Sequence, residues 1–219
     1  MAHAHPAGGR HPGWPARPGA LRVPAGVVAL RPVQLRDGSA WSALRIRDEA
    51  HLAPWEPSMP GTWSQRHASV EWPGRWMLLR AAARRGSALP FVITLDGRLA
   101  GHVMIGNVVR EPLLSGYVGY WCDQRVTGSG VTTAAVALAV DHCFSVAGLH
   151  RLEATVRPEN GASRRVLEKL GFREEGLFRR YLDVDGAWRD HLCFAMTVED
   201  VPAGGLVGRV VAGGRAARA

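Results

Sequence analysis

The most informative part of the sequence is residues 121–134, which read WCDQRVTGSGVTTA. A β-type run ends there, a short glycine-containing loop follows, and an apolar helical run begins. Such a turn leaves several backbone N–H groups unpaired at the positive end of a helix dipole, where anions bind. Gly128 and Gly130 let the backbone approach a phosphate closely, and Thr132 or Thr133 adds a hydroxyl. The stretch therefore predicts a phosphate-binding loop between a strand and a helix.

The glycine pair does not by itself identify the bound anion, because many ordinary strand-to-helix connections contain Gly-x-Gly. No Gly-Lys-Ser/Thr follows the pair, which excludes a Walker loop. The third glycine and the later ribose-binding acid of a dinucleotide fingerprint are also missing. The neighbouring elements therefore have to identify the site.

The pattern on both sides of the loop predicts an alternation of strands and helices. Residues 27–33 form a β-type run that leads into a helical stretch, and prolines break residues 51–64 into a loop. Asp-Gly pairs between apolar runs predict two hairpins. The expected elements after the first helix are a helix in the second half of 65–86, a hairpin over 91–105, a strand at 115–122, a helix at 130–147, a strand at 151–156, a helix at 160–170 and a hairpin over 178–196. This order predicts an α/β (α+β) fold with a mixed sheet covered by helices.

The two ends of the 219-residue chain differ in composition from the middle. Residues 1–24 are dense in Pro, Gly, Ala and Arg and have no apolar period. The segment after Pro202 contains glycine pairs and arginines and resembles the first end. We therefore expect a disordered N-terminal extension at 1–24, one folded domain at 25–202 and a flexible C-terminal tail at 203–219.

The net charge of +8 is concentrated at these ends. Six arginines and no acids lie in residues 1–24 and 203–219, so residues 25–202 hold 21 basic and 19 acidic residues. A nearly neutral domain argues against specific nucleic-acid binding. The basic ends favour only weak, salt-sensitive association with an anionic assembly such as the ribosome.

Other function classes are excluded by simple counts. No apolar run approaches the roughly 20 residues needed to span a bilayer, and no secretory signal begins the chain, so a cytoplasmic protein is expected. Cys122, Cys143 and Cys193 lack the paired spacings of a metal site. We expect no metal cofactor and three free thiols that are buried or face a cofactor.

A second polar cluster begins the helix expected at 160–170. Asn160 is placed to cap this helix, and Ser163 follows three residues later. Both side chains therefore lie at one helix start, beside the end of the strand at 151–156. An ordinary cap with a first-turn serine explains the pair as well as a functional site does.

The run Asn160-x-x-Ser163, followed by Leu-Glu-Lys-Leu-Gly-Phe-Arg-x-Glu-Gly at 167–176, closely resembles the cofactor-side helix of GNAT acetyltransferases of the ribosomal-protein alanine N-acetyltransferase (RimJ/RimL) group. Further segments that resemble this group are LAPWEP at 52–57, FVITLDG at 91–97, GYVGYW at 116–121, GLHRLE at 148–153 and YLDVDGAWRDH at 181–191. The resemblance covers roughly residues 25–198. It implies the GNAT fold, with a mixed central sheet of about six to seven strands and helices on both faces, and acetyl-CoA as cosubstrate.

The glycine loop resembles the family's pyrophosphate loop, Gln/Arg-x-x-Gly-x-Gly/Ala, in two registers. Arg125 with Gly128 and Gly130 matches the letters. Counting from the strand end instead places Thr127 at the Gln/Arg position, Gly130 at the central glycine and Thr132 at the last small residue, and we prefer this register. In either register the backbone from Gly128 to Thr132 forms the cradle.

In the family, a neutral amine attacks the acetyl thioester directly. The amine proton must be accepted, the oxyanion stabilised and the CoA thiolate protonated. The resemblance gives the oxyanion and the pantetheine arm to backbone groups of a splayed strand end, which here are those of Trp121, Cys122 and Asp123. A covalent role for the cysteine there is disfavoured because no nearby base or cation would lower its pKa. The residues expected to contact acetyl-CoA are Trp121, Cys122, Asp123, Thr127, Gly128, Ser129, Gly130, Val131, Thr132, Asn160 and Ser163.

The catalytic candidates that the resemblance implies are Ser163, Asn160, Glu56 and Asp183. Ser163 is the expected general acid, and Asn160 would contact the pantetheine arm. The base is open: Glu56 and Asp183 are equal candidates, Asp185 and His191 are weaker ones, and solvent water would also suffice.

Three functions remain open at this point. The first is acetylation of a protein N-terminus, such as that of a ribosomal protein. The second is acetylation of a small amine, such as an amino acid, a polyamine or an antibiotic. The third is a non-catalytic acyl-CoA-binding module. The sequence also leaves open whether the chain forms a homodimer.

Overall fold

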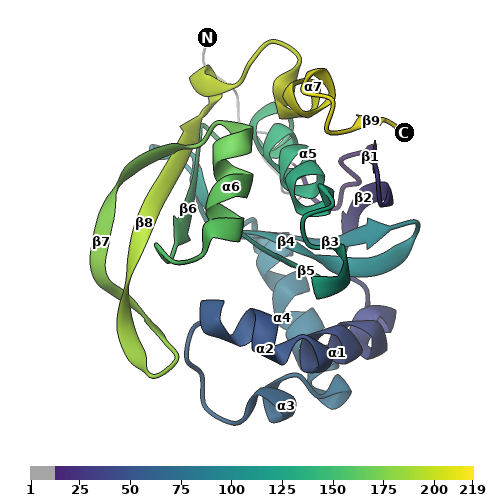
Figure 1. Cartoon of the computed structure of the whole chain (residues 1–219), viewed down its shortest axis with the longest axis vertical. Coiled ribbons are helices and arrows are strands. Elements are labelled where there is room, and N and C mark those ends of the chain that lie inside the picture. Colours follow the sequence, from purple (N-terminus) through teal and green to yellow (C-terminus); the bar gives the residue numbers. More distant parts are fainter. Residues whose placement is uncertain (1–12) are drawn as a thin grey trace.

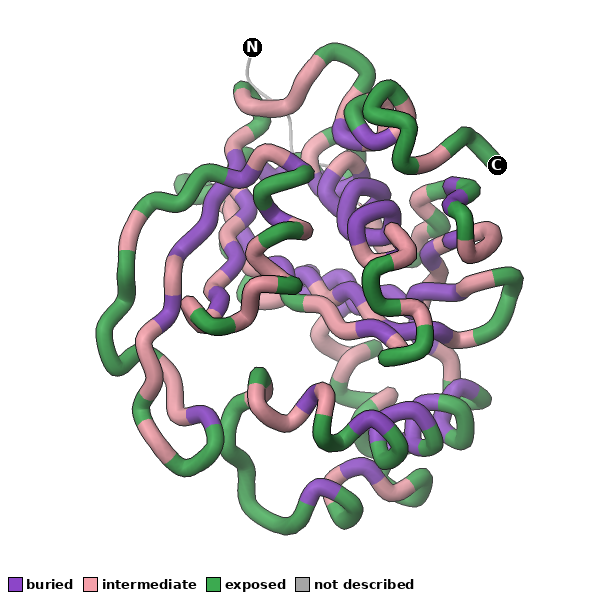
Figure 2. The backbone as a smooth tube through the Cα atoms, viewed as in Figure 1, coloured by how far each residue is buried: buried purple, intermediate pink, exposed green. Residues whose placement is uncertain are grey.

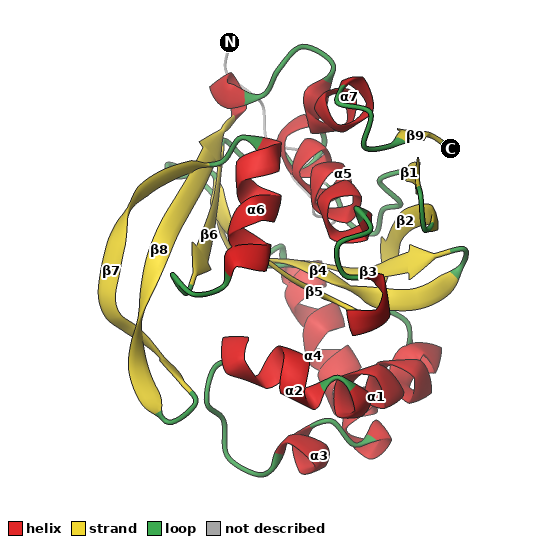
Figure 3. Ribbon diagram, in the orientation of Figure 1, coloured by secondary structure: helices red, strands yellow, loops and turns green. Residues whose placement is uncertain are grey.

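The computed structural model describes residues 13–219, which form a nine-stranded mixed sheet covered by helices on both faces (Figures 1 and 3). The strand order across the sheet is β7-β8-β6-β5-β4-β3-β2-β1-β9. The strands are β1 (Ala20–Val23), β2 (Gly26–Pro32), β3 (Leu89–Leu95), β4 (Arg98–Val109), β5 (Ser115–Cys122), β6 (Arg151–Val156), β7 (Arg173–Val184), β8 (Ala187–Thr197) and β9 (Ala217–Arg218). The predicted fold class is confirmed.

The helices divide between the two faces of the sheet (Figure 1). On one face lie α5 (Val131–Ser145), α6 (Gly161–Leu170) and α7 (Gly205–Ala212). On the other lie α1 (Gly38–Arg47), α2 (Glu49–Leu52), α3 (Trp63–Arg66) and α4 (Trp72–Arg85). Short 3-10 turns connect them: η1 (Leu35–Asp37), η2 (Ala53–Trp55), η3 (Ser69–Glu71), η4 (Gln124–Val126) and η5 (Val198–Asp200).

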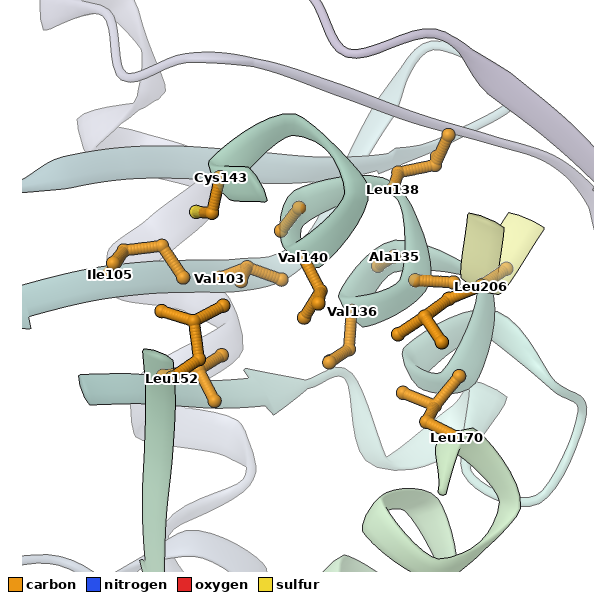
Figure 4. Close-up of a cluster of buried hydrophobic side chains, with 14 of the residues drawn as sticks. Val103, Ile105, Ala135, Val136, Leu138, Val140, Cys143, Leu152, Leu170 and Leu206 are labelled. Atoms are coloured by element: carbon orange, nitrogen blue, oxygen red, sulfur yellow. The ribbon is translucent and has the colours of Figure 1, made fainter. Parts of the chain in front are cut away.

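Helix α5 is the centre of the larger core (Figure 2). Its run of alanine, valine and leucine contains no glycine or proline, and Gly130 caps its start with a left-handed backbone (φ 88°). Figure 4 shows side chains of the sheet, α6 and α7 meeting those of α5, and the labelled ones are Val103, Ile105, Ala135, Val136, Leu138, Val140, Cys143, Leu152, Leu170 and Leu206. Each such aliphatic side chain contributes about 1.5–3 kcal/mol when fully buried, so α5 is fixed firmly against the sheet.

The sheet opens between β5 and β6, its one parallel pair within the described part of the chain. These strands pair only at residues 115–117 and 151–153. Beyond that point β5 stays paired with β4 as far as Cys122, and β6 stays paired with β8 as far as Val156. The second half of β5 therefore has a free backbone edge toward β6.

The ends of the folded domain correct the sequence analysis. Of the segments expected to be disordered or flexible, residues 20–23 form β1 beside β2, residues 205–212 form α7 against α5, and residues 217–218 pair with β1. A few apolar side chains at the correct spacing, such as Leu21 and Leu206, fold these glycine-rich segments onto a large existing core. The additional strands β1 and β9 also raise the strand number above six to seven. Residues 1–12 lie outside the described part.

Candidate active site

A cleft of about 700 Å³ lies between the glycine loop and α6 on one side and α1, η2 and α4 on the other. The open part of β5 forms its floor, including the exposed Gly119, where an added Cβ would meet no atom of the described chain within 4 Å. The predicted site residues that line this cleft are Glu56, Trp121, Cys122, Thr127, Gly128, Gly130, Thr132, Asn160 and Ser163. Four others do not line it: Asp123, Ser129, Val131 and Asp183.

The glycine loop has the geometry of an anion cradle. Gly128 and Gly130 both have a left-handed backbone, with φ of 81° and 88°, which favours glycine. The first-turn N–H groups of α5, which begin at Val131, have no preceding carbonyl in the helix to pair with. The Ser129 hydroxyl donates to the Val126 carbonyl at 2.6 Å and therefore supports the loop. Val131 contributes only backbone, because its side chain is fully buried in the core.

The backbone N–H groups that face the opening beside β5 are not all those of the predicted residues. The Asp123 N–H donates to the Ala100 carbonyl at 2.7 Å, and Cys122 is the register partner of Gly101. Because hydrogen-bonded pairs alternate along an antiparallel ladder, Trp121 also directs its N–H toward β4, whereas Tyr120 and Cys122 direct theirs toward the opening. The backbone assignment to Trp121 and Asp123 is therefore corrected to Tyr120 and Cys122.

Asp123 supports the cleft from outside through its side chain. Its carboxylate is ion-paired with Arg47 and accepts the Arg125 N–H at 2.8 Å. Arg47 also pairs with the buried Asp48, which accepts the Gln124 N–H at 2.9 Å. This network ties the end of α1 to the segment that leads into the glycine loop.

The Cys122 thiol is buried at the end of β5, and its burial raises its pKa above the ordinary value. Its sulfur lies 3.9 Å from the Thr127 hydroxyl oxygen. A thiol with a raised pKa is a poor nucleophile at neutral pH. All three cysteines are free and buried, as expected.

Ser163 is in contact with a tyrosine that the sequence analysis missed. The Tyr120 hydroxyl lies 2.9 Å from the Ser163 hydroxyl and 3.2 Å from the Ser163 carbonyl oxygen, and its one proton can go to either acceptor. Burial raises the pKa of Tyr120, so the phenol stays protonated. Asn160 caps α6 by accepting the Ser163 N–H at 3.0 Å. One sequence signal could have revealed Tyr120: side chains two residues apart in a strand lie on the same face, so Tyr120 shares a face of β5 with Cys122.

Arg45 organises the other side of the cleft. It is buried, forms an ion pair with Glu56 and lies over the rings of Trp63 and Trp121 at 4.7 and 5.0 Å. Arg45 also donates a hydrogen bond to His67 Nε2 at 2.9 Å. Because Nε2 is then the acceptor, the proton of the neutral His67 ring must be on Nδ1, which lies 2.8 Å from the Trp63 carbonyl oxygen. Arg45 thereby fixes the orientation of Glu56 in the cleft.

The other base candidates lie elsewhere. The Asp183 carboxylate accepts the Ser58 hydroxyl at 2.7 Å, and the Asp183 carbonyl accepts the Ser58 N–H at 2.9 Å. Asp183 thus anchors the proline-rich loop to the β7–β8 hairpin. Asp185 is in the hairpin turn with φ 56°, and His191 is buried beside the Arg189 carbonyl. Glu56 is the predicted base candidate that reaches the cleft.

Two further features are absent from residues 13–219. No cluster of three or more His, Cys, Asp or Glu side chains there could hold a metal ion. No helix in that range has the length and apolar character needed to cross a bilayer.

A parallel strand pair that opens beside a glycine loop at a helix start is the architecture of GNAT acetyltransferases. Residues 28–173 match the family described as acetyltransferase (GNAT) domain. The chain therefore belongs to the GNAT N-acetyltransferases, and within them to the RimJ/RimL-like group.

The group assignment rests on close relatives. The structure of Mycobacterium smegmatis RimJ in complex with CoA-disulfide matches with a TM-score of 0.94 and 56% identity, over 95% of this chain and 100% of that one. The [ribosomal protein uS5]-alanine N-acetyltransferase of Escherichia coli (strain K12) is 29% identical over 183 residues, or 82% of this chain and 92% of that protein. The probable N-acetyltransferase YjcK of Bacillus subtilis (strain 168) is 42% identical over 105 residues, which span 48% of this chain and 58% of that relative.

Proposed function

We propose that this enzyme transfers the acetyl group of acetyl-CoA to the N-terminal α-amine of a protein, most specifically to an N-terminal alanine of a ribosomal protein. The E. coli relative is named for that reaction on uS5, and the M. smegmatis relative is a RimJ. Since ribosomal proteins are made in the cytoplasm, we also propose a cytoplasmic location.

The observation that carries the proposal is the free edge of β5 on the floor of the cleft. It lies between a loop suited to phosphates and a pocket rich in aromatic side chains. Because Gly119 leaves this floor open, an extended acceptor can reach the strand from the side of α1 and α4. The arrangement suits a reaction between two ligands that enter from opposite sides.

The residues of the cofactor side fit acetyl-CoA. The first-turn N–H groups of α5 and the loop at Gly128 and Gly130 would bind the pyrophosphate, and Arg165 and Lys169 of α6 add positive charge to the lining of the cleft. Bound acetyl-CoA supplies the activated acetyl thioester. The N–H groups of Tyr120 and Cys122 would stabilise the developing oxyanion.

Proton transfers are assigned to side chains of the same cleft. Ser163 would donate a proton to the departing thiolate and regain one from solvent, while the Tyr120 hydroxyl, 2.9 Å away, would hold the serine hydroxyl in position. Glu56, oriented by Arg45, is our candidate to accept the proton of the amine, directly or through water. Asn160 would hold the pantetheine arm from the start of α6.

The test is the release of CoA thiol from acetyl-CoA in the presence of different amines. An alanine-starting peptide should support turnover, whereas the same peptide with a blocked N-terminus should not. Turnover with free amino acids, polyamines or aminated antibiotics in place of peptides would favour a small-molecule acetyltransferase. Tight acetyl-CoA binding without turnover on any amine would favour a non-catalytic module.

A further inference from the structure

The acceptor side of the cleft carries more positive charge than its own acids neutralise. Arg45 and Arg75 both line it, and Glu56 is the carboxylate paired with Arg45. Arg75 lies in the first turn of α4, with its guanidinium 5.0 Å from the centre of the Trp41 ring. Among residues 13–219, no acid lies within ion-pair distance of Arg75, although Glu56 and, more weakly, the exposed Glu71 act on it from farther away.

Arg75 can be reached by a ligand, because the residue is exposed at the cleft. Partial desolvation and the charge of Arg45 lower its pKa, against a smaller opposing effect of Glu56. A cation in the first turn of a helix also opposes the helix dipole. An exposed guanidinium that lies against an aromatic ring, with no ion-pair partner among residues 13–219, can bind an anionic group of a ligand.

The surroundings of Arg75 indicate the chemistry of that ligand. The wall of this side of the cleft is formed by aromatic and aliphatic side chains: Trp41, Leu52, Trp55, Leu79, Met104 and Trp121. In the same wall, His102 Nε2 is buried without a hydrogen-bond partner, and burial keeps the ring neutral by lowering its pKa to about 3. An acceptor that carries apolar surface, a hydrogen-bonding group and an anion fits this pocket. A polyamine does not fit, because Arg75 would repel it.

We propose that Arg75 binds a carboxylate of the acceptor polypeptide, the side chain of an Asp or Glu close behind the acetylated N-terminus. This inference rests on the proposed function and narrows its substrate class. A guanidinium suits the task because its planar fork binds both carboxylate oxygens, and stacking on Trp41 holds the plane in place.

The test is a series of alanine-starting peptides of otherwise neutral sequence, with a single Glu at the second, third, fourth or fifth position and a Gln control for each. With the wild-type enzyme, one position should give a kcat/KM about tenfold higher for Glu than for Gln. That ratio should fall to about one in Arg75→Gln and should recover only partly in Arg75→Lys. Arg85→Gln, an exposed arginine at the end of the same helix, should keep the wild-type ratio.

A binding measurement tests the role of Arg75 without relying on turnover. Calorimetric titration of the CoA-saturated enzyme should show the same preference for the Glu peptide, and Arg75→Gln should abolish it. Raising the ionic strength should weaken the preference.

The two hypotheses fail in different ways. Acetylation of all peptides with equal rates for Glu and Gln at every position would overturn the role of Arg75 and leave the proposed function intact. Absence of acetylation on any peptide would overturn the proposed function. Arg75-dependent acetylation of a small amino dicarboxylate, with no activity on peptides, would also overturn the polypeptide assignment.

Discussion

Tyr120 and Ser163 come from different elements, β5 and α6, yet their hydroxyl oxygens lie 2.9 Å apart. The pairing matters because the serine hydroxyl has one proton. If Tyr120 donates to Ser163, the serine proton is free to point into the cleft. If Tyr120 donates to the Ser163 carbonyl, the serine proton points back to the phenol. The tyrosine therefore positions the proposed acid.

Replacing Ser163 by Ala should lower kcat by about 10²-fold to 10³-fold, since positioned proton transfer contributes about that much, with little effect on the affinity for CoA. Tyr120→Phe should lower kcat less and shift its pH profile. Stopped-flow turnover and calorimetric CoA binding measure the two quantities. An unchanged kcat in Ser163→Ala would refute the acid assignment.

His67 should make the protein sensitive to mild acid. Burial, with the charges of Arg45 and Arg75, lowers its pKa from 6.5 to about 4. The unfolded chain therefore binds a proton between those values while the folded chain does not, so stability is present above pH 6.5 and is lost as the pH falls toward 4. The loss amounts to at most about 3 kcal/mol.

The measurement is the free energy of unfolding in urea as a function of pH. His67→Gln should reduce the slope between pH 6.5 and 4 by the share of one proton, with His102 supplying a slope that remains, whereas the exposed His150→Gln should retain the full slope. Equal slopes in all three proteins would contradict the role of His67.

At the scale of elements, α7 shows how a segment without a strong pattern becomes structured. Asp141 of α5 accepts the N–H groups of Leu206 and Val207 at 2.8 and 2.9 Å, which satisfies the start of α7. Arg209 donates to the Leu170 carbonyl at the end of α6. Helix α7 therefore joins the two helices that flank the cofactor side of the cleft.

Leu206→Ala should destabilise the fold by about 3 kcal/mol, because this side chain is fully buried in the main core. Leu78→Ala on the exposed face of α4 is the matched control and should change stability by less than about 0.5 kcal/mol. Chemical unfolding compares them. If Leu206→Ala were as stable as Leu78→Ala, α7 would not be part of the folded core.

At the scale of the whole molecule, the sequence predicted the layered α/β fold because strand and helix periods, Asp-Gly turns and the Asn160 cap are local signals. It did not predict β1, α7 and β9, whose few apolar residues are stabilised only by contact with distant parts of the core. Dependence on distant parts of the chain is also the reason why no role was predicted for Tyr120 or Arg75. The roles of Tyr120 and Arg75 depend on Ser163 and Trp41, which are far away in the chain. That Arg75 has no ion-pair partner among residues 13–219 is also something that no local pattern reveals.

The central claim is transfer of an acetyl group to a protein N-terminus, and tandem mass spectrometry of the product tests it most directly. The enzyme is incubated with isotopically labelled acetyl-CoA and an alanine-starting peptide that also contains an internal lysine. The expected result is one labelled acetyl group on the alanine α-amine, with an equal amount of CoA thiol released. Label on the lysine alone, or no labelled peptide despite bound acetyl-CoA, would contradict the claim.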